Sequence, residues 1–227
     1  MLVGHFAAGL AAKAALPRIS LWACLLAVQL VDVAWAVLVL AGVERFHLDP
    51  SLASNPLVLE HMPYTHSLVG ALAGGALAAL AARCAFAWAT PRAAAVLGLA
   101  VASHWLLDLV VHRPDLTLWG AEPKLGFGLW NHVGAALLLE LGLLAAATWA
   151  CIRVGGPLET RRGRLAWLVA ALAALQVASL GPVPPPPVPV LAASLLGLFV
   201  LVAWAGAWVE APYASRPPSA TNSLPVQ

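Results

Sequence analysis

Charged residues are scarce in this chain of 227 residues. Lys, Arg, Asp and Glu make up only 10% of it, whereas they make up about a quarter of a typical soluble domain. Apolar residues make up 62%, and the mean hydropathy is +0.87. A soluble protein of this composition would lack the polar surface to cover itself, so the sequence predicts an integral membrane protein. The small net charge of +2 gives no reason to expect nucleic-acid binding.

Paired cysteines and the common catalytic signatures are also missing. Cys24, Cys84 and Cys151 show no CxxC spacing, so they predict neither a disulfide framework nor a zinc knuckle. The chain contains no GxSxG, no HExxH and no P-loop. Serine hydrolases, zincin proteases and nucleotide-driven proteins therefore find no support among its motifs.

Long apolar segments fill most of the chain. A transmembrane helix needs about 20 residues, and six segments reach or approach this length: 19–42, 65–88, 92–112, 129–152, 164–181 and 190–210. Residues 2–16 are shorter, so this first helix either tilts or enters the bundle without crossing it. Backbone polar groups in lipid must be satisfied internally. We therefore expect an all-α polytopic bundle of six to seven helices over residues 1–210, followed by a disordered tail over 211–227.

Basic residues are distributed unequally over the connecting segments. If the first helix spans, nine Lys and Arg residues fall on one side, and only Arg45, Arg113 and Lys124 fall on the other. The positive-inside rule then makes the first side, with the C-terminus, cytoplasmic. Loops 43–64 and 113–128 become non-cytoplasmic, and all seven histidines fall in that half.

The stretch SHWLLDLVVHRPDL places three titratable residues on one stripe of the helix over 92–112. His104, Asp108 and His112 follow one another at four-residue intervals, which puts successive members about 6 Å apart along a helix axis. Because His104 and His112 are then about 12 Å apart, one ion takes Asp108 with only one of them. Charge in hydrocarbon costs roughly 3 kcal/mol or more, so these groups should face the bundle interior and form a site. The structural alternative is a His–Asp pair that joins helices.

Other titratable residues accompany this stripe. Asp32, the deepest acid of the segment 19–42, is a candidate general base. His66 begins the segment 65–88, and His5 has small neighbours that permit close helix packing. A further group is expected at the rim of the site or behind it: His61, His112, Arg113, His132 and Glu140. Arg113 either meets an anionic head group or anchors at the interface.

Histidine with carboxylate, in the absence of thiolate pairs, suits Zn²⁺ or Mn²⁺ with a position left open for water. The predicted ligands are His5, His66, His104 and Asp108. Such an ion would supply hydroxide near neutral pH, and Asp32 would act as base beside it.

The order of these residues resembles a family of bacterial inner-membrane proteins, the membrane-bound metal-dependent hydrolases. His5 with Gly9 matches its H-x-x-x-G, HMPYTHS matches its H-R-G-x-T-H-S, and His104 with Asp108 matches its later H-x-x-x-D. The resemblance covers roughly residues 1–112 and implies a metal-dependent hydrolase of the bacterial inner (plasma) membrane. Two features depart from the family pattern: Asp32 stands alone where P-D-x-D is usual, and Met-Pro replaces Arg-Gly in the third motif.

The sequence thus favours metal-assisted hydrolysis of an ester or phosphoester, with membrane lipid as the expected partner, at the non-cytoplasmic interface. Two alternatives remain open. The same residues would serve a proton- or metal-coupled transporter, or a noncatalytic scaffold in which the polar cluster only holds helices together.

Overall fold

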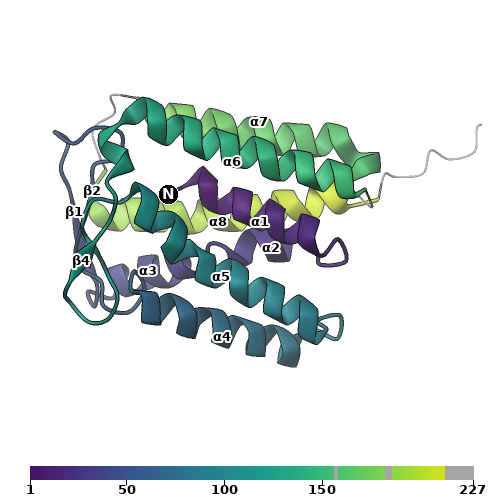
Figure 1. Ribbon diagram of the computed structural model, residues 1–227, viewed down its shortest axis with the longest axis horizontal. Coiled ribbons are helices and arrows are strands. Elements are labelled where there is room, and N and C mark those ends of the chain that lie inside the picture. The colour runs from purple at the N-terminus through teal and green to yellow at the C-terminus, as the bar shows by residue number, and fades with distance from the viewer. Residues whose placement is uncertain (156–157, 182–185, 213–227) are drawn as a thin grey trace, which may run out of the picture.

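The computed structural model describes residues 1–155, 158–181 and 186–212. Eight α-helices within these ranges run side by side along one axis (Figure 1). Their bounds are α1 Val3–Ala15, α2 Leu21–Ala27, α3 Leu30–Leu40, α4 Leu68–Ala85, α5 Pro91–Val111, α6 Val133–Val154, α7 Arg162–Ala178 and α8 Val188–Glu210. Two short 3-10 helices, η1 (Leu129–Asn131) and η2 (Glu159–Arg161), precede α6 and α7. Most of the predicted tail, residues 213–227, lies outside the described part.

Four of these helices, α4, α5, α6 and α8, are long and apolar enough to cross a membrane. Taken together, α2 and α3 would make a fifth span. The predicted helical bundle is confirmed, but the predicted count of six to seven spanning helices is not exact: by length and composition, four or five of the described helices could cross a membrane. Large apolar side chains are exposed on the outside of the bundle, including Leu77, Leu99, Leu138 and Val200, as expected for a surface that lipid covers.

The segment 19–42, predicted as one helix, is broken. α2 ends at Ala27, α3 begins at Leu30, and their axes differ by 49°. The break leaves the carbonyl of Val28 free to accept a hydrogen bond from His104 at 2.9 Å. Nothing in the run of apolar residues around Gln29 signals this bend, because it depends on a partner from another helix.

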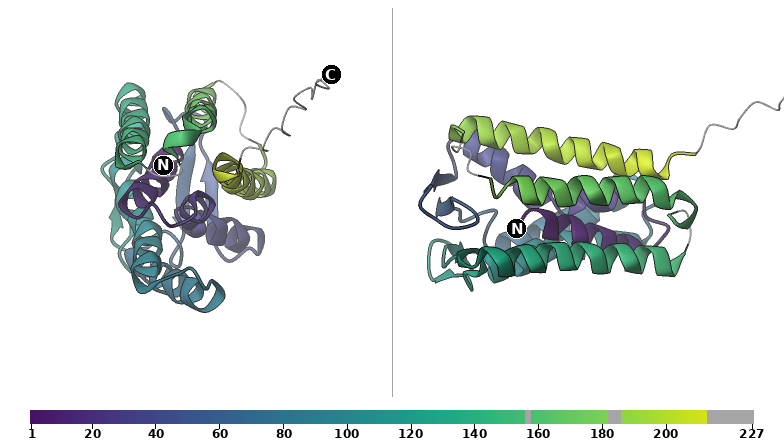
Figure 2. Two further views of the ribbon diagram at one scale, coloured as in Figure 1. Left: turned by 90° about the vertical axis from the view of Figure 1, so that its right-hand side faces the viewer. Right: turned by 90° about the horizontal axis from the view of Figure 1, so that it is seen from above.

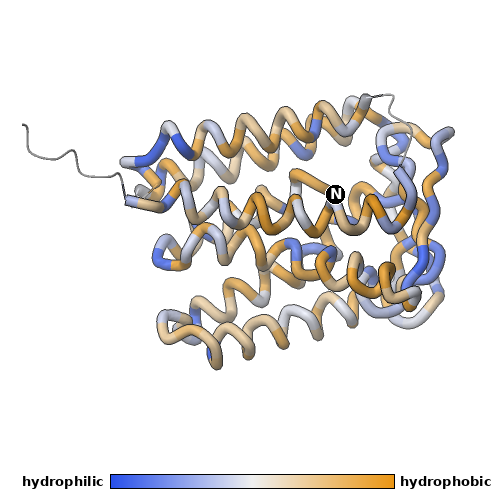
Figure 3. The backbone as a smooth tube through the Cα atoms, turned by 180° about the vertical axis from the view of Figure 1, so that it is seen from behind, coloured by the Kyte–Doolittle hydropathy of each residue, from blue (hydrophilic) through white to orange (hydrophobic). Residues whose placement is uncertain are grey.

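Both long polar loops lie at one end of the bundle and fold into short antiparallel hairpins. β1 (Arg45–Leu48) pairs with β2 (Leu57–His61), and β3 (Leu116–Thr117) pairs with β4 (Lys124–Leu125). We call this the hairpin end. Figure 3 shows hydrophilic residues gathered there and at the opposite end, with apolar helices between them.

α1 lies inside the bundle between α5 and α6 (Figures 1 and 2). Its 13 residues span only about 20 Å, so it does not cross a bilayer core of about 30 Å. Gly9 permits close packing on α2, since a Cβ there would lie 3.1 Å from the carbonyl oxygen of Cys24. The short first helix of the sequence prediction is therefore an internal helix whose first turn lies well within the bundle.

At the opposite end, α1 is tied to α8 by a buried ion pair. Lys13 Nζ lies 2.5 Å from Glu210 Oε1 and also donates to the carbonyls of Pro17 and Ile19. The second oxygen of Glu210 accepts the backbone N–H of Leu21, at the start of α2. Lys13, one of the nine basic residues of the predicted cytoplasmic side, thus anchors the turn between α1 and α2.

Candidate metal centre

Six titratable side chains from separate parts of the chain meet inside the bundle, toward the hairpin end. Each histidine side chain is at most 4% exposed, Asp108 is 2% exposed and Asp32 is 17% exposed. We call this group the histidine–aspartate cluster; its members are His5 of α1, Asp32 of α3, His66 just before α4, His104 and Asp108 of α5, and His112 at the C-terminal cap of α5.

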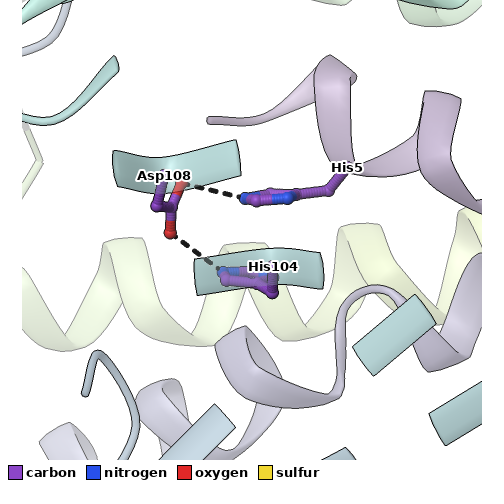
Figure 4. A group of neighbouring side chains, drawn as sticks. All are labelled: His5, His104 and Asp108. Carbon is purple, nitrogen blue, oxygen red and sulfur yellow. Dashed lines mark hydrogen bonds and ion pairs between the residues drawn. The ribbon is translucent and has the colours of Figure 1, made fainter. Parts of the chain in front are cut away.

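Asp108 lies at the centre of the cluster. Its Oδ1 is 3.1 Å from His5 Nε2 and 3.7 Å from His112 Nε2, and its Oδ2 is 3.1 Å from His104 Nε2 and 3.8 Å from His66 Nε2. Figure 4 shows Asp108 between His5 and His104, with one oxygen directed at each ring. The carboxylate thus contacts four imidazoles at once.

His112 reaches Asp108 because α5 ends one residue before it. The backbone at His112 is extended, with φ −61° and ψ 147°. The estimate that separated His104 from His112 by two helical turns assumed a helix through residue 112. With the chain turned away after Val111, the two rings contact different oxygens of the same carboxylate.

Asp32 completes a second set of contacts. Its Oδ1 lies 3.4 Å from His104 Nε2 and 3.6 Å from His66 Nε2. Two groups of three residues therefore have ligand atoms close enough together to hold a metal ion: His5 with His104 and Asp108, and Asp32 with His66 and His104. In a tetrahedral site with metal–ligand bonds of about 2.0–2.1 Å, the ligand atoms are about 3.3 Å apart. The contacts of His66 and His104 with both aspartates, at 3.1–3.8 Å, are close to that spacing.

The outer nitrogens of His104 and His112 make good hydrogen bonds. His104 Nδ1 donates to the Val28 carbonyl at 2.9 Å, and His112 Nδ1 donates to Asp115 Oδ1 at 2.9 Å. Because a carbonyl and a carboxylate only accept, each Nδ1 carries the proton. Nε2 is then the atom that each ring directs at the carboxylates. Metal-ligating histidines are commonly oriented in this way.

His66 is oriented through Thr65 and Glu44. The Thr65 hydroxyl donates to Glu44 Oε2 at 2.5 Å, so its oxygen accepts from His66 Nδ1 at 3.0 Å. Glu44 is itself 1% exposed and also accepts the backbone N–H groups of Tyr64 and Thr65. Burial lowers the pKa of His66 to about 4, so its ring is neutral near pH 7 and its Nε2 is free to bind a cation.

His5 is held by its neighbours in α5 and α6. Its ring stacks on that of His104, with centroids 3.6 Å apart and planes 11° from parallel. Its Nδ1 is buried with no hydrogen-bond partner in the described part of the chain. Glu140 Oε2 accepts the backbone N–H groups of Leu2, Val3 and Gly4 at 2.8–3.1 Å and so caps the first turn of α1. Glu140, predicted at the rim or behind the site, thus anchors the turn that carries His5.

The α-amino group of Met1 is a further buried charge beside the cluster. It lies 2.5 Å from Asp108 Oδ1, the oxygen that also contacts His5 and His112. One positive charge therefore already neutralises part of the negative charge of the aspartates.

A cavity of about 590 Å³ opens beside the cluster. Asp32, His66, Asp108 and His112 line it, whereas His5 and His104 lie behind them. The remaining walls come from the loop between β1 and β2, the end of α7 and the first half of α8. A ligand in this cavity would thus meet one face of the cluster.

Three predicted rim residues take no part in the cluster. His61, in β2, and His132, before α6, are exposed. Arg113 donates to Asn131 Oδ1 and to the carbonyls of Asn55 and Ala53. It fixes the loop that covers the cavity, and its guanidinium is engaged by the protein instead of pointing to a head group.

Two functional candidates were absent from the sequence analysis. Asp115 follows His112 by three residues, a spacing that a closer look at HRPD could have flagged. Glu44 carries no comparable signal, because 21 residues separate it from Thr65.

Comparison with known proteins adds no further information. No family model, no curated protein and no solved structure matches this chain. The resemblance to metal-dependent hydrolases therefore stays a prediction.

Proposed function

We propose that this protein is a membrane-embedded hydrolase that depends on a divalent metal ion. The observation that carries the proposal is the orientation of the histidines. His66 and His104 bind protein acceptors through Nδ1 and present Nε2 to Asp32 and Asp108 at ligand spacing. We assign these four residues as the ligands. His5 remains an alternative ligand through the group that it forms with His104 and Asp108.

The charge of the cluster supports a divalent ion. Asp32, Asp108 and Glu140 carry three formal negative charges around one cavity, and the Met1 amino group supplies one positive charge. When the histidines are neutral, as metal binding requires of them, negative charge is in excess, and a divalent ion would neutralise it. Uncompensated charge inside a membrane protein is costly, so this balance favours ion binding over an empty cluster.

The donor set favours Zn²⁺, with Mn²⁺ as the alternative, because imidazole suits the first and carboxylate suits both. Such an ion, when bound, would activate water for attack and polarise an ester or phosphoester oxygen. In this assignment Asp32 is a ligand, where the sequence suggested a general base.

His112 is the residue best placed to accept a proton in the cavity. It lines the cavity, and Asp115 holds its Nδ1–H, which leaves Nε2 as the basic atom. The second oxygen of Asp115 accepts the backbone N–H of Leu59 in β2 and fixes the carboxylate in turn. A base held by a carboxylate is the usual arrangement for proton transfer to and from water.

The packing beyond the cluster supports a one-sided site over a route across the membrane. Between His5 and Lys13, the interior side chains of α1 and its neighbours are apolar: Phe6, Leu10, Leu21, Leu25 and Val101 are at most 1% exposed. A transported ion would have to cross this layer. Most Lys and Arg residues lie at the end opposite the hairpin end, and the positive-inside rule assigns that end to the cytoplasm. In this orientation the site faces the non-cytoplasmic interface.

The proposal is tested with purified protein in nanodiscs. We expect about one divalent ion per chain by elemental analysis, and hydrolysis of at least one member of a panel of lipid esters and phosphoesters. Both should be lost in His104→Asn and kept in His61→Asn, the matched control at an exposed histidine. Chelation should abolish the activity, and Zn²⁺ or Mn²⁺ should restore it.

Two other results would contradict the proposal. Bound ion without turnover, but with ion uptake into protein-containing liposomes, would identify a transporter. Absence of bound ion in the wild type would also contradict the proposal, and a lowered thermal stability of His104→Asn would then identify a scaffold whose helices the cluster holds together.

A further inference from the structure

The cavity beside the cluster contains two buried polar atoms that the proposed chemistry does not use. Trp35 is 3% exposed and Gln176 is 6% exposed, and both line the cavity. The indole Nε1 of Trp35 and the amide Oε1 of Gln176 have no hydrogen-bond partner within the described residues. A buried polar atom that stays unsatisfied is destabilising, so both point to a ligand that pairs with them.

Much of the remaining wall is apolar. Leu48, Leu52 and Leu57 lie in and around the first hairpin, and Leu191, Leu195 and Phe199 follow one face of α8. A volume of about 590 Å³ is typical of pockets for ligands of drug size, and apolar walls hold water poorly. The cavity therefore suits an amphiphilic molecule and is much larger than an ion with its water requires.

We propose that the cavity binds a membrane lipid with a hydroxylated head group. Its acyl chain would lie against the apolar face of α8, an ester or phosphate oxygen would accept from Trp35 Nε1, and a hydroxyl would donate to Gln176 Oε1. Trp35 lies next to the cluster, with its ring centroid 6.1 Å from that of His66. The identification of this lipid as the substrate rests on the proposed hydrolase function. The binding of the lipid in the cavity does not depend on that function.

The surroundings of the cavity indicate the membrane as the source of this ligand. The cavity extends between Ala178–Gly181 at the end of α7 and Leu191 in α8. Val177 near the end of α7 and Val190 near the start of α8 are 55% and 52% exposed. Lipid would cover these side chains, so the described parts of α7 and α8 that line the cavity also face the membrane.

Competitive lipid binding tests the proposal. The purified protein, with whatever metal it carries, is placed in nanodiscs that contain equal amounts of phosphatidylglycerol and phosphatidylmethanol with the same acyl chains. Both lipids carry one negative charge and the same acceptor oxygens, but only the first has free hydroxyls. Native mass spectrometry then measures which lipid stays bound. We expect a five- to tenfold preference for phosphatidylglycerol, the range that one hydrogen bond of about 1–1.4 kcal/mol gives.

The variants give different expected results. Gln176→Leu should remove the preference, whereas Trp35→Phe should weaken the binding of both lipids about fivefold with the ratio unchanged. Gln29→Leu is the matched control, because Gln29 is another buried amide that finds no hydrogen-bond partner among the described residues, but it does not line the cavity; it should keep the preference. Should Gln176→Leu fail to fold, the wild-type ratio and Trp35→Phe still decide the question.

Three outcomes would overturn the inference: equal retention of the two lipids by the wild type, retention of neither above the bulk level, or loss of preference in Gln29→Leu as well. Bound metal is measured on separate samples. A protein that selects the hydroxylated lipid but binds no ion would refute the hydrolase and leave the lipid site standing.

Discussion

Thr65→Val is the most informative single substitution. The change removes one hydroxyl and nearly preserves the shape of the side chain. That hydroxyl accepts from His66 Nδ1 at 3.0 Å and donates to Glu44 Oε2 at 2.5 Å. Removal of such an outer partner of a ligand typically weakens metal binding 10- to 100-fold, and we expect that loss here. We also expect the free energy of unfolding to fall by about 2 kcal/mol, since two buried groups lose a partner. Glu44 keeps its two backbone N–H partners, which limits the effect.

The assay is a competition titration against a chelator of known affinity, with thermal unfolding measured on the same samples. Thr117→Val is the matched control, because Thr117 is 2% exposed and its hydroxyl has no hydrogen-bond partner in the described part of the chain. It should bind metal as the wild type does. If Thr65→Val also binds metal with wild-type affinity, then His66 is not a ligand oriented by this chain of hydrogen bonds, and the assigned ligand set is wrong.

Three further predictions concern residues around the cluster. Asp115→Asn should lower turnover about 100-fold without loss of bound metal, because the Asp115 carboxylate contacts His112 and the backbone N–H of Leu59 but none of the assigned ligands; equal turnover per bound ion would contradict the assignment of the base. Glu140→Gln should lower the free energy of unfolding by about 1–2 kcal/mol and speed hydrogen exchange at the first amides of α1, since the cap loses its charge; unaltered exchange there would refute the capping role. Lys13→Met should cost about 3 kcal/mol by leaving Glu210 unpaired, with metal affinity unchanged, and the double variant with Glu210→Gln should recover most of that stability in chemical denaturation.

The sequence was most informative about where helices and titratable residues lie along the bundle, and least informative about which residues they hydrogen-bond. Apolar segments predicted α1, α5 and α8 to within about three residues at each end, because the cost of exposing backbone in lipid leaves little choice of structure. Exposure of titratable side chains to lipid is costly as well, so these side chains face the interior of the bundle. Those at the same position along the bundle axis then lie close together. His5 and Asp108, 103 residues apart, could be expected at one site for this reason.

The bend between α2 and α3 and the role of Glu44 could not be predicted in this way. Both depend on a hydrogen bond to a residue far along the chain: Val28 to His104, and Glu44 to Thr65. Periodicity and hydropathy describe which face of a helix is buried, but they do not say which acceptor a side chain will find there. The position of the His112 ring could not be predicted for a related reason, since the exact end of α5 decides where the ring points.

The hydrogen-bond lengths in the cluster favour the proposed ion site over a cluster that only joins helices. If the histidines only joined helices, their best hydrogen bonds would be those to the aspartates. The opposite is found for His66, His104 and His112. Their Nδ1 atoms, which point out of the cluster, contact acceptors at 2.9–3.0 Å. Their Nε2 atoms, which point into it, lie 3.1–3.8 Å from Asp32 and Asp108. The Nε2 of His104 makes no hydrogen bond to any described residue. Close hydrogen bonds on the outside fix the rings, and looser spacing on the inside leaves a place for a cation between them.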